Sequence, residues 1–188
     1  MVPGVEIAHL SGRSFGSKAV IWGLPILIVA TVLHTGPLFF DEALRHRTLG
    51  LFGTGSMVNL VGLLLGLGLT HEAIHGLVLV ALGDRQARLT VTWSGVAIVP
   101  GRRPQSRRRY LGLLLAPLAI LLPVSVALSW LWLGRDGWFD LVLAGVSHAA
   151  GCSLDVYIAR WIWTLPDDTI LVNHYPEPLR AYRAVRGG

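Results

Sequence analysis

The chain has 188 residues, of which 53% are hydrophobic and 14% are charged, and its formal net charge is +5 at pH 7. A soluble domain carries roughly 25% charged residues, so this composition leaves too little polar surface to cover a water-soluble globule. It excludes a disordered chain, a collagen-like repeat and, with a single cysteine, a disulfide-stapled secreted domain. The sequence therefore predicts an integral membrane protein.

Four apolar stretches reach the roughly 20 residues that a membrane-spanning helix needs. In chain order they cover about residues 19–40, 56–82, 111–133 and 138–165. The segments between them are polar or carry glycine and arginine. We expect an all-α bundle of about four transmembrane helices, forming one membrane-embedded domain over residues 1–188.

The basic residues divide unevenly between the two sides of such a bundle. With four spans, the side that holds both termini carries 12 of them: Arg13, Lys18, Arg85, Arg88, Arg102, Arg103, Arg107, Arg108, Arg109, Arg180, Arg183 and Arg186. The opposite side carries Arg45, Arg47 and Arg135. Because positive loops remain in the cytoplasm, we expect both termini to be cytoplasmic. Basic loops beside a bilayer also explain the charge without nucleic acid, for which no reading module is visible.

The segment between the second and third stretches predicts a short β-hairpin at the cytoplasmic face. Residues 89–93 and 96–99 alternate or are β-branched, and Ser94-Gly95 between them is typical of a turn. Such a hairpin could hold a substrate segment by strand addition. The arginines that follow, Arg102, Arg103 and Arg107 to Arg109, are interpreted as an anchor on anionic lipid, with substrate binding as the alternative.

The second apolar stretch contains H-E-A-I-H at residues 71–75. His71 and His75 lie one helical turn apart on one face, so that they can bind one Zn²⁺ together while Glu72 activates a water molecule. Each ionisable group at bilayer depth costs roughly 2.5–3.5 kcal/mol, which favours a functional role for all three. The alternative is a pair of histidines hydrogen-bonded inside a packed bundle.

A catalytic zinc needs a third protein ligand and an open position. His148, Cys152 and Asp155 share one helical face of the fourth stretch. Measured from the cytoplasmic ends of their stretches, Asp155 and His71 lie at comparable depth, whereas His148 lies about 10 Å too deep at 1.5 Å per residue. Asp155 is therefore the preferred third ligand, with a structural carboxylate as the alternative. His148 is interpreted as an outer-shell or channel-lining residue and Cys152 as a packing residue.

This arrangement, H-E-x-x-H in a second span and an aspartate in a fourth, resembles the site-2 protease class of intramembrane zinc metalloproteases. The chain is also similar, over about residues 69–182, to a bacterial family of small four-span zincin membrane peptidases. The similarity rests on residues 71–76, 115–117, 147–148, 154–155, 165–169 and 173–174. It implies Zn²⁺ as the cofactor, His71, His75 and Asp155 as its ligands, Glu72 as the catalytic acid and base, and a bacterial cell membrane as the location.

The sequence departs from both patterns near the aspartate. Val156 stands where site-2 proteases usually have glycine, Leu154 stands where the small family usually has glycine, and no Asn-Pro motif precedes Asp155. These departures leave the metal ligands in place and concern substrate positioning and oxyanion stabilisation.

The function that these observations favour is an intramembrane zinc metalloprotease. Its expected partners are the lipid bilayer and a membrane-embedded or membrane-associated peptide or protein as substrate. The alternative is a non-enzymatic metal-binding membrane protein, either a metal or proton carrier or a scaffold. A carrier needs a polar path through both leaflets, whereas the polar residues concentrate in the cytoplasmic half, apart from His34, Asn59 and His148.

Overall fold

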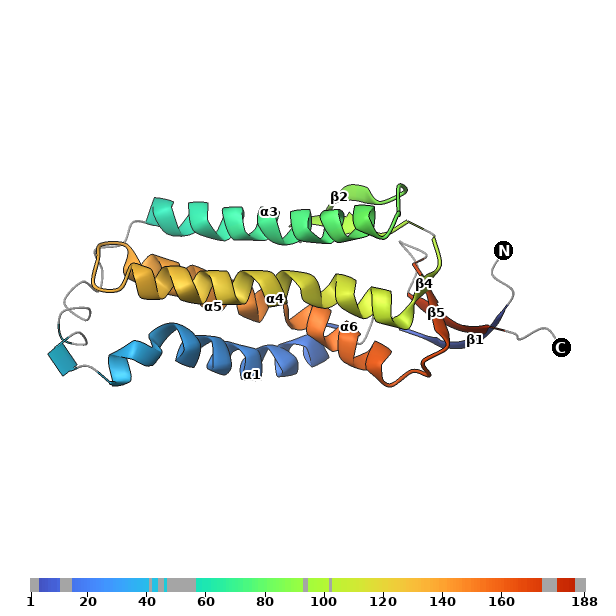
Figure 1. The fold of residues 1–188 in the computed structure, drawn as a ribbon, viewed down its shortest axis with the longest axis horizontal. Helices are drawn as coiled ribbons and strands as arrows, with labels where there is room; N and C mark the ends of the chain where they lie inside the picture. Colours follow the sequence, from blue (N-terminus) through green and yellow to red (C-terminus); the bar gives the residue numbers. More distant parts are fainter. Residues whose placement is uncertain are drawn as a thin grey trace. The chain divides into compact units, whose positions relative to one another are not determined.

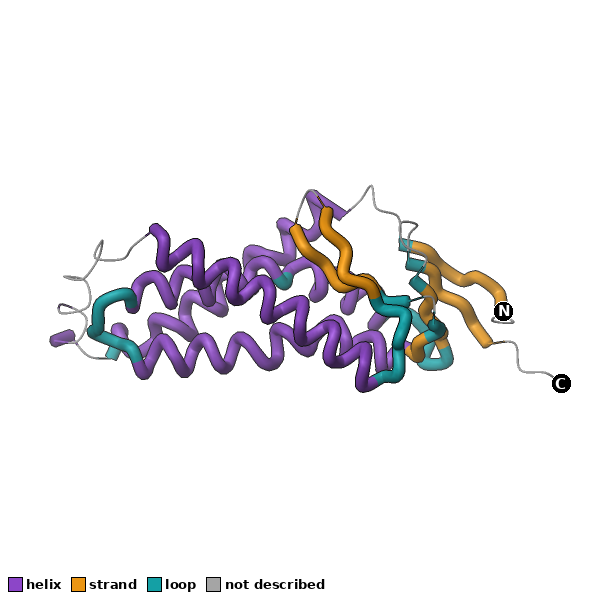
Figure 2. The backbone as a smooth tube through the Cα atoms, turned by 90° about the horizontal axis from the view of Figure 1, so that it is seen from above, coloured by secondary structure: helices purple, strands orange, loops and turns teal. Residues whose placement is uncertain are grey.

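The computed structural model describes residues 4–10, 15–40, 42–43, 46, 57–92, 95–101, 103–173 and 179–184. These residues are mostly helical (Figures 1 and 2). The helices are α1 (Phe15–Thr35), the 3-10 helix η2 (Gly36–Phe39), α3 (Met57–Ala81), α4 (Arg107–Leu131), α5 (Trp138–Gly151) and α6 (Ser153–Trp163).

Three segments of the described chain are long and apolar enough to cross a membrane. They are Met57–Ala81, Arg107–Leu131 and Trp138–Trp163, the last of which comprises α5 and α6. The first predicted stretch forms α1 and η2, and its apolar segment, Gly23–Phe39, is shorter. By length and composition, these helices indicate a membrane protein.

The fourth predicted stretch, 138–165, forms two helices rather than one. The break falls at Cys152, whose backbone N–H donates to the carbonyls of His148 and Ala149 at 3.1 and 3.2 Å. An i→i+3 bond tightens the last turn of a helix, and the adjacent Gly151 has a low helix propensity. The helix therefore ends and begins again just before Asp155.

A four-stranded antiparallel sheet corrects the expectation of an all-α bundle with a hairpin alone. Its strand order is β1-β6-β5-β4. The strands are β1 (Gly4–His9), β4 (Gln105–Ser106), β5 (Thr169–Val172) and β6 (Arg180–Ala184). These strands are short and come from three distant parts of the chain, and a pairing between distant segments leaves no local sequence pattern. The segment before the first helix therefore pairs with the segment after the last helix: β1 pairs with β6.

A second, two-stranded antiparallel sheet follows α3 in the chain. It consists of β2 (Arg88–Thr92) and β3 (Gly95–Val99), with Thr92 opposite Gly95 and Arg88 opposite Val99. Residue 93 of the predicted first strand and residue 94 of the predicted turn lie outside the described residues, and Gly95, predicted in the turn, is the first residue of β3. The cytoplasmic location of this pair stays a prediction.

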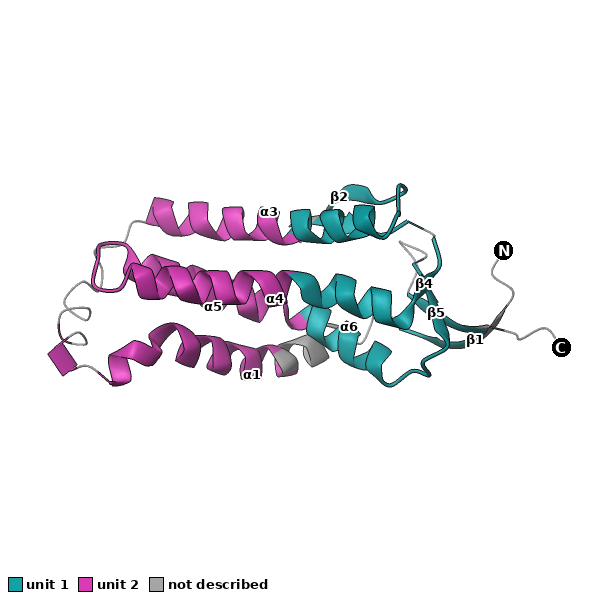
Figure 3. Cartoon of the chain, viewed as in Figure 1, with its two compact units in different colours: residues 1–19, 72–116, 154–188 teal, residues 20–71, 117–153 magenta. Residues whose placement is uncertain are grey.

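The chain divides into two compact units (Figure 3). Unit 1 comprises residues 1–19, 72–116 and 154–188, and unit 2 comprises residues 20–71 and 117–153. The core of unit 1 packs the start of α4 and α6 against the four-stranded sheet: Tyr110, Leu111, Leu114, Ala159, Ile162, Leu171 and Ala181. The core of unit 2 is formed by α1 and α5: Ala30, Trp138, Val142, Val146 and Ala149. Each unit therefore has its own buried apolar cluster.

Unit 2 contains one fully buried histidine outside the H-E-x-x-H sequence. His34 Nδ1–H donates to the Ala30 carbonyl at 2.7 Å, and its Nε2 lies 3.1 Å from Ser125 Oγ. Gly145 gives the ring its space, because a Cβ there would lie 2.4 Å from His34 Nε2. These contacts assign His34 a structural role in the packing of unit 2.

Candidate metal centre

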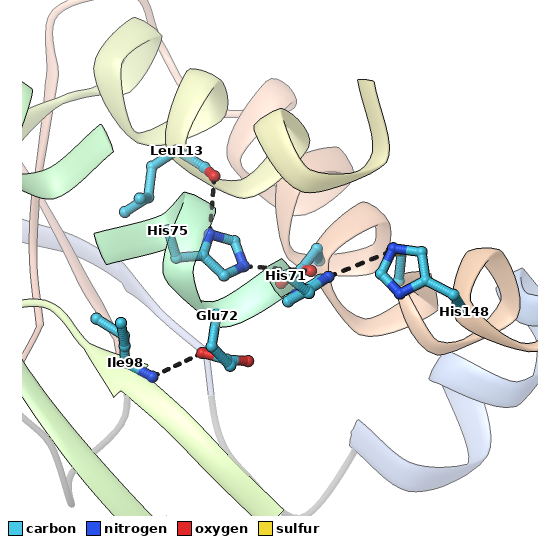
Figure 4. A network of polar contacts seen from close by, with 8 residues as sticks. His71, Glu72, His75, Ile98, Leu113 and His148 are labelled. Atoms are coloured by element: carbon cyan, nitrogen blue, oxygen red, sulfur yellow. Dashed lines mark hydrogen bonds and ion pairs between the residues drawn. The ribbon is translucent and has the colours of Figure 1, made fainter. Parts of the chain in front are cut away.

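In unit 1, His75 of α3 lies beside Asp155 of α6, and Glu72 precedes His75 by three residues on α3. Figure 4 shows Glu72 and His75. We call Glu72, His75 and Asp155 the carboxylate cluster. His75 Nδ1 lies 3.0 Å from the Leu113 carbonyl, and since a carbonyl can only accept, Nδ1 carries the proton and donates it. The other ring nitrogen, Nε2, lies 3.6 Å from Asp155 Oδ2. Both side chains are largely buried, with exposed fractions of 11% and 16%.

The His75–Asp155 pair fits the requirements of a zinc site. A backbone carbonyl that accepts from Nδ1–H fixes the ring and directs the lone pair of Nε2, which is the usual outer-shell arrangement of a metal-binding histidine. A nitrogen and an oxygen ligand of a tetrahedral zinc lie about 3.4 Å apart, given bonds of about 2.0–2.2 Å. The observed 3.6 Å is close to that separation. A cation between the lone pair and the carboxylate, whether a metal ion or a proton on Nε2, satisfies both groups.

Glu72 is held by the strand pair. Its Oε2 accepts a hydrogen bond of 2.7 Å from the backbone N–H of Ile98 in β3. The same strand lies against α3 at Gly76, where a Cβ would come within 2.8 Å of Ile98 Cδ1. The glycine that follows the H-E-x-x-H sequence therefore allows β3 to approach the helix closely, and the approach places an amide donor on the glutamate.

The contact with Glu72 also fixes which way β3 faces. The Ile98 N–H donates to Glu72, so it points away from β2. In an antiparallel pair, the outward and inward positions alternate, so the backbone N–H and C=O of Val96 point the same way as those of Ile98. The outer edge of β3 thus lies along the side of α3 that carries Glu72.

His71 is the last residue of its segment in unit 2 and immediately precedes Glu72 in the unbroken helix α3. Helix geometry places it one turn before His75, on the same face. Within unit 2, His71 Nδ1 lies 3.6 Å from Cys152 Sγ, which lies 3.7 Å from His148 Nε2. We call His71, His148 and Cys152 the thiol cluster.

The sequence offered Asp155, His148 and Cys152 as candidates for a third ligand. Asp155 lies beside His75, whereas His148 and Cys152 lie beside His71. Two supporting groups were not identified from the sequence, the Leu113 carbonyl and the Ile98 N–H. Both are backbone groups that any residue type supplies, and the hairpin pattern before the arginine cluster was the only signal for the second.

The arginine cluster, predicted to anchor the chain on lipid, also makes specific contacts in unit 1. Arg107 donates to the Asp167 carboxylate and, at 2.8 Å, to the Trp163 carbonyl. Its guanidinium carbon lies 5.5 Å from the centroid of the Trp163 ring. Arg103 donates to the Gly83 carbonyl. Arg107 therefore links the start of α4 to the end of α6, the two helices that carry Leu113 and Asp155.

A family model described as "putative zincin peptidase" matches residues 64–170. The match covers more than half of the 188 residues and includes both the H-E-x-x-H sequence and Asp155. No curated protein and no solved structure matches the chain significantly. The family description implies zinc-dependent peptidase chemistry, which agrees with the imidazole and carboxylate groups gathered at His75. The chain belongs to the family of putative zincin peptidases.

Proposed function

We propose that the protein is an intramembrane zinc metallopeptidase, similar to the site-2 protease class, in which His71, His75 and Asp155 hold the metal and Glu72 is the catalytic acid and base. The observation that carries this proposal is the carboxylate cluster. The His75 ring, oriented by the Leu113 carbonyl, faces the Asp155 carboxylate at 3.6 Å, three residues along the helix from Glu72. His71 joins this set because it precedes His75 by one turn of the same helix.

Zinc, when bound, supplies Lewis-acid chemistry: it polarises the scissile carbonyl and acidifies a water molecule. The chain's own residues supply the proton transfers. Glu72 takes a proton from the attacking water and delivers it to the leaving amine, which is general acid–base catalysis. The Ile98 N–H holds one carboxylate oxygen of Glu72 at 2.7 Å and so limits the orientations open to that side chain.

The outer edge of β3 is the place where we propose that a substrate segment binds. An extended peptide can add to this edge through the backbone N–H and C=O of Val96 and the C=O of Ile98, while the Ile98 N–H stays with Glu72. The position fits a peptidase, since the same edge contacts Glu72. An extended segment also exposes its amide bonds, which a helical membrane segment keeps engaged in its own hydrogen bonds.

The four-stranded sheet supports four membrane crossings with both termini on one side. The sheet joins β1, which precedes α1, to β4, which lies between α3 and α4, and to β5 and β6, which follow α6. Paired strands lie on the same side of a bilayer, so the chain crosses an even number of times between β1 and β4. If α3 crosses, α1 crosses as well. The positive-inside rule then places the sheet, the strand pair and both termini in the cytoplasm of a bacterial cell.

A chelation experiment tests the proposal. The purified protein in detergent is incubated with a set of synthetic apolar peptides that contain helix-breaking residues, and the products are identified by mass spectrometry. We expect at least one zinc per chain, loss of cleavage when a chelator removes the zinc, and recovery when zinc alone is restored. Cleavage that persists in metal-free protein, or a folded protein that binds no zinc, would refute the proposal. Metal flux into liposomes without any cleavage would favour a carrier instead.

A further inference from the structure

The thiol cluster is a second group of potential metal ligands, and it lies entirely within unit 2. His148 stands in the last turn of α5, and Cys152 follows four residues later, at the break before α6. Together with His71 they offer two imidazole nitrogens and one sulfur, all within 4.8 Å of one another. The rings of His71 and His148 meet edge to face, with centroids 5.3 Å apart. Cys152 is fully buried.

The separations within this cluster match those of a tetrahedral zinc site. Zinc binds thiolate sulfur at about 2.3 Å and imidazole nitrogen at about 2.0–2.1 Å, so that a sulfur and a nitrogen ligand at the tetrahedral angle lie about 3.6 Å apart. The sulfur of Cys152 lies 3.6 Å from His71 Nδ1 and 3.7 Å from His148 Nε2. Both distances are close to this ligand spacing.

The chemistry of the cluster differs from that of the carboxylate cluster. A thiolate is a soft ligand that selects zinc and other thiophilic ions over magnesium or calcium. A metal ion can bind the sulfur and both ring nitrogens at once, with the thiolate as its anionic ligand.

We infer that His71 Nδ1, His148 Nε2 and Cys152 Sγ form a second metal-binding site, specific for a thiophilic divalent cation such as Zn²⁺. It requires neither Glu72, His75 nor Asp155, and it shares only the ring of His71 with the set proposed for peptide hydrolysis. It therefore goes beyond the peptidase proposal and can hold or fail independently of it.

Cobalt substitution tests this inference, because the chain contains one cysteine. Any thiolate-to-cobalt charge-transfer band in the near ultraviolet therefore reports Cys152. The metal-free full-length protein is titrated with Co²⁺ as the wild type and as the variants His75→Ala, Asp155→Asn and Cys152→Ala. We expect the band in the wild type and in the first two variants, and its loss in Cys152→Ala. His148→Ala should weaken Co²⁺ binding at this band by at least about 10-fold.

The contrary outcomes are equally distinct. Absence of the band in wild-type protein saturated with Co²⁺ would overturn the inference, and this result needs no variant to fold. A band that disappears in folded His75→Ala or Asp155→Asn protein would assign the thiolate to a single mixed site, which also overturns it. The first result leaves the peptidase proposal untouched, because that proposal is tested by zinc-dependent cleavage, whereas the second would also add Cys152 to its metal ligands.

Discussion

The two clusters contain similar ligands but differ in what surrounds them. In the carboxylate cluster the His75 imidazole faces Asp155, and a second carboxylate, Glu72, three residues before His75, accepts a hydrogen bond from a backbone amide. The thiol cluster joins two imidazoles to a buried sulfur and contains no carboxylate. Hydrolysis needs a base next to the attacking water, so only the first cluster has the composition of a catalytic site. Under the proposed function, the histidines would therefore supply metal affinity, while Glu72 would supply the base that hydrolysis needs.

The largest effect is expected when the imidazole of His75 is removed from the carboxylate cluster. We expect His75→Ala to lower zinc affinity and peptide cleavage by more than about 100-fold, beyond the 10–100-fold cost typical of outer-shell changes. His46→Ala, which alters an exposed histidine, should change neither quantity. Zinc affinity is measured by competition with a chromophoric chelator. Unchanged cleavage in His75→Ala would remove this residue from the site.

The aspartate offers a more conservative change with a matched control. Asp155→Asn keeps the size of the side chain but replaces the anionic oxygen, and we expect zinc affinity to fall about 10- to 100-fold. Asp140→Asn makes the same change at another buried aspartate, in α5 and outside both clusters, and should leave zinc affinity unchanged. Equal losses in the two variants would mean that Asp155 acts through folding rather than through the metal.

The approach of β3 to α3 can be tested with two glycines of one helix. At Gly76 a larger side chain meets Ile98, whereas no atom outside the helix lies within 4 Å of a Cβ at Gly62. Gly76→Val and Gly62→Val share the same change in helix propensity. We expect Gly76→Val to be less stable by a further 1–3 kcal/mol or so, and to lose protection of the Ile98 amide in hydrogen exchange. Equal stability and equal Ile98 protection in the two variants would show that the close approach of β3 to α3 does not contribute to stability.

The smallest expected effect concerns the support of the carboxylate cluster by Arg107. Arg107→Ala removes the contacts to Asp167 and Trp163, and we expect a loss of stability of about 1–2 kcal/mol with zinc binding retained. Arg108→Ala changes an exposed neighbour and should stay within about 0.5 kcal/mol of the wild type. Thermal unfolding in detergent measures both, and a larger loss in Arg108→Ala would contradict the assignment.

The parts of the site that the sequence could reveal are those set by local spacing. The i, i+4 spacing of His71 and His75 follows from helix geometry, and depth along the stretches distinguished Asp155 from His148. Depth alone did not indicate that His148 and Cys152 would lie beside His71, since the side-by-side packing of helices depends on contacts between distant segments. The break at Cys152 likewise depends on one bifurcated backbone contact, which apolar composition does not signal.

The four-stranded sheet was beyond prediction for a related reason. Its strands are 2–6 residues long and come from segments separated by whole helices. The arginines of β6 were interpreted as markers of membrane side, an interpretation that described their charge but not the pairing of this segment with β1 and β5. Strands so far apart in the sequence can pair only where the helices between them bring their segments close together.

The most direct test of the central claim compares wild-type protein with Glu72→Gln at equal zinc content. The substitution keeps the size of the side chain and an oxygen that can accept from the Ile98 N–H, but it removes the base. Both proteins are loaded to about one zinc per chain and incubated with the same peptides. The account predicts that Glu72→Gln retains its zinc and cleaves more slowly by about 10²–10⁴-fold. Cleavage at the wild-type rate by the zinc-loaded variant would contradict it.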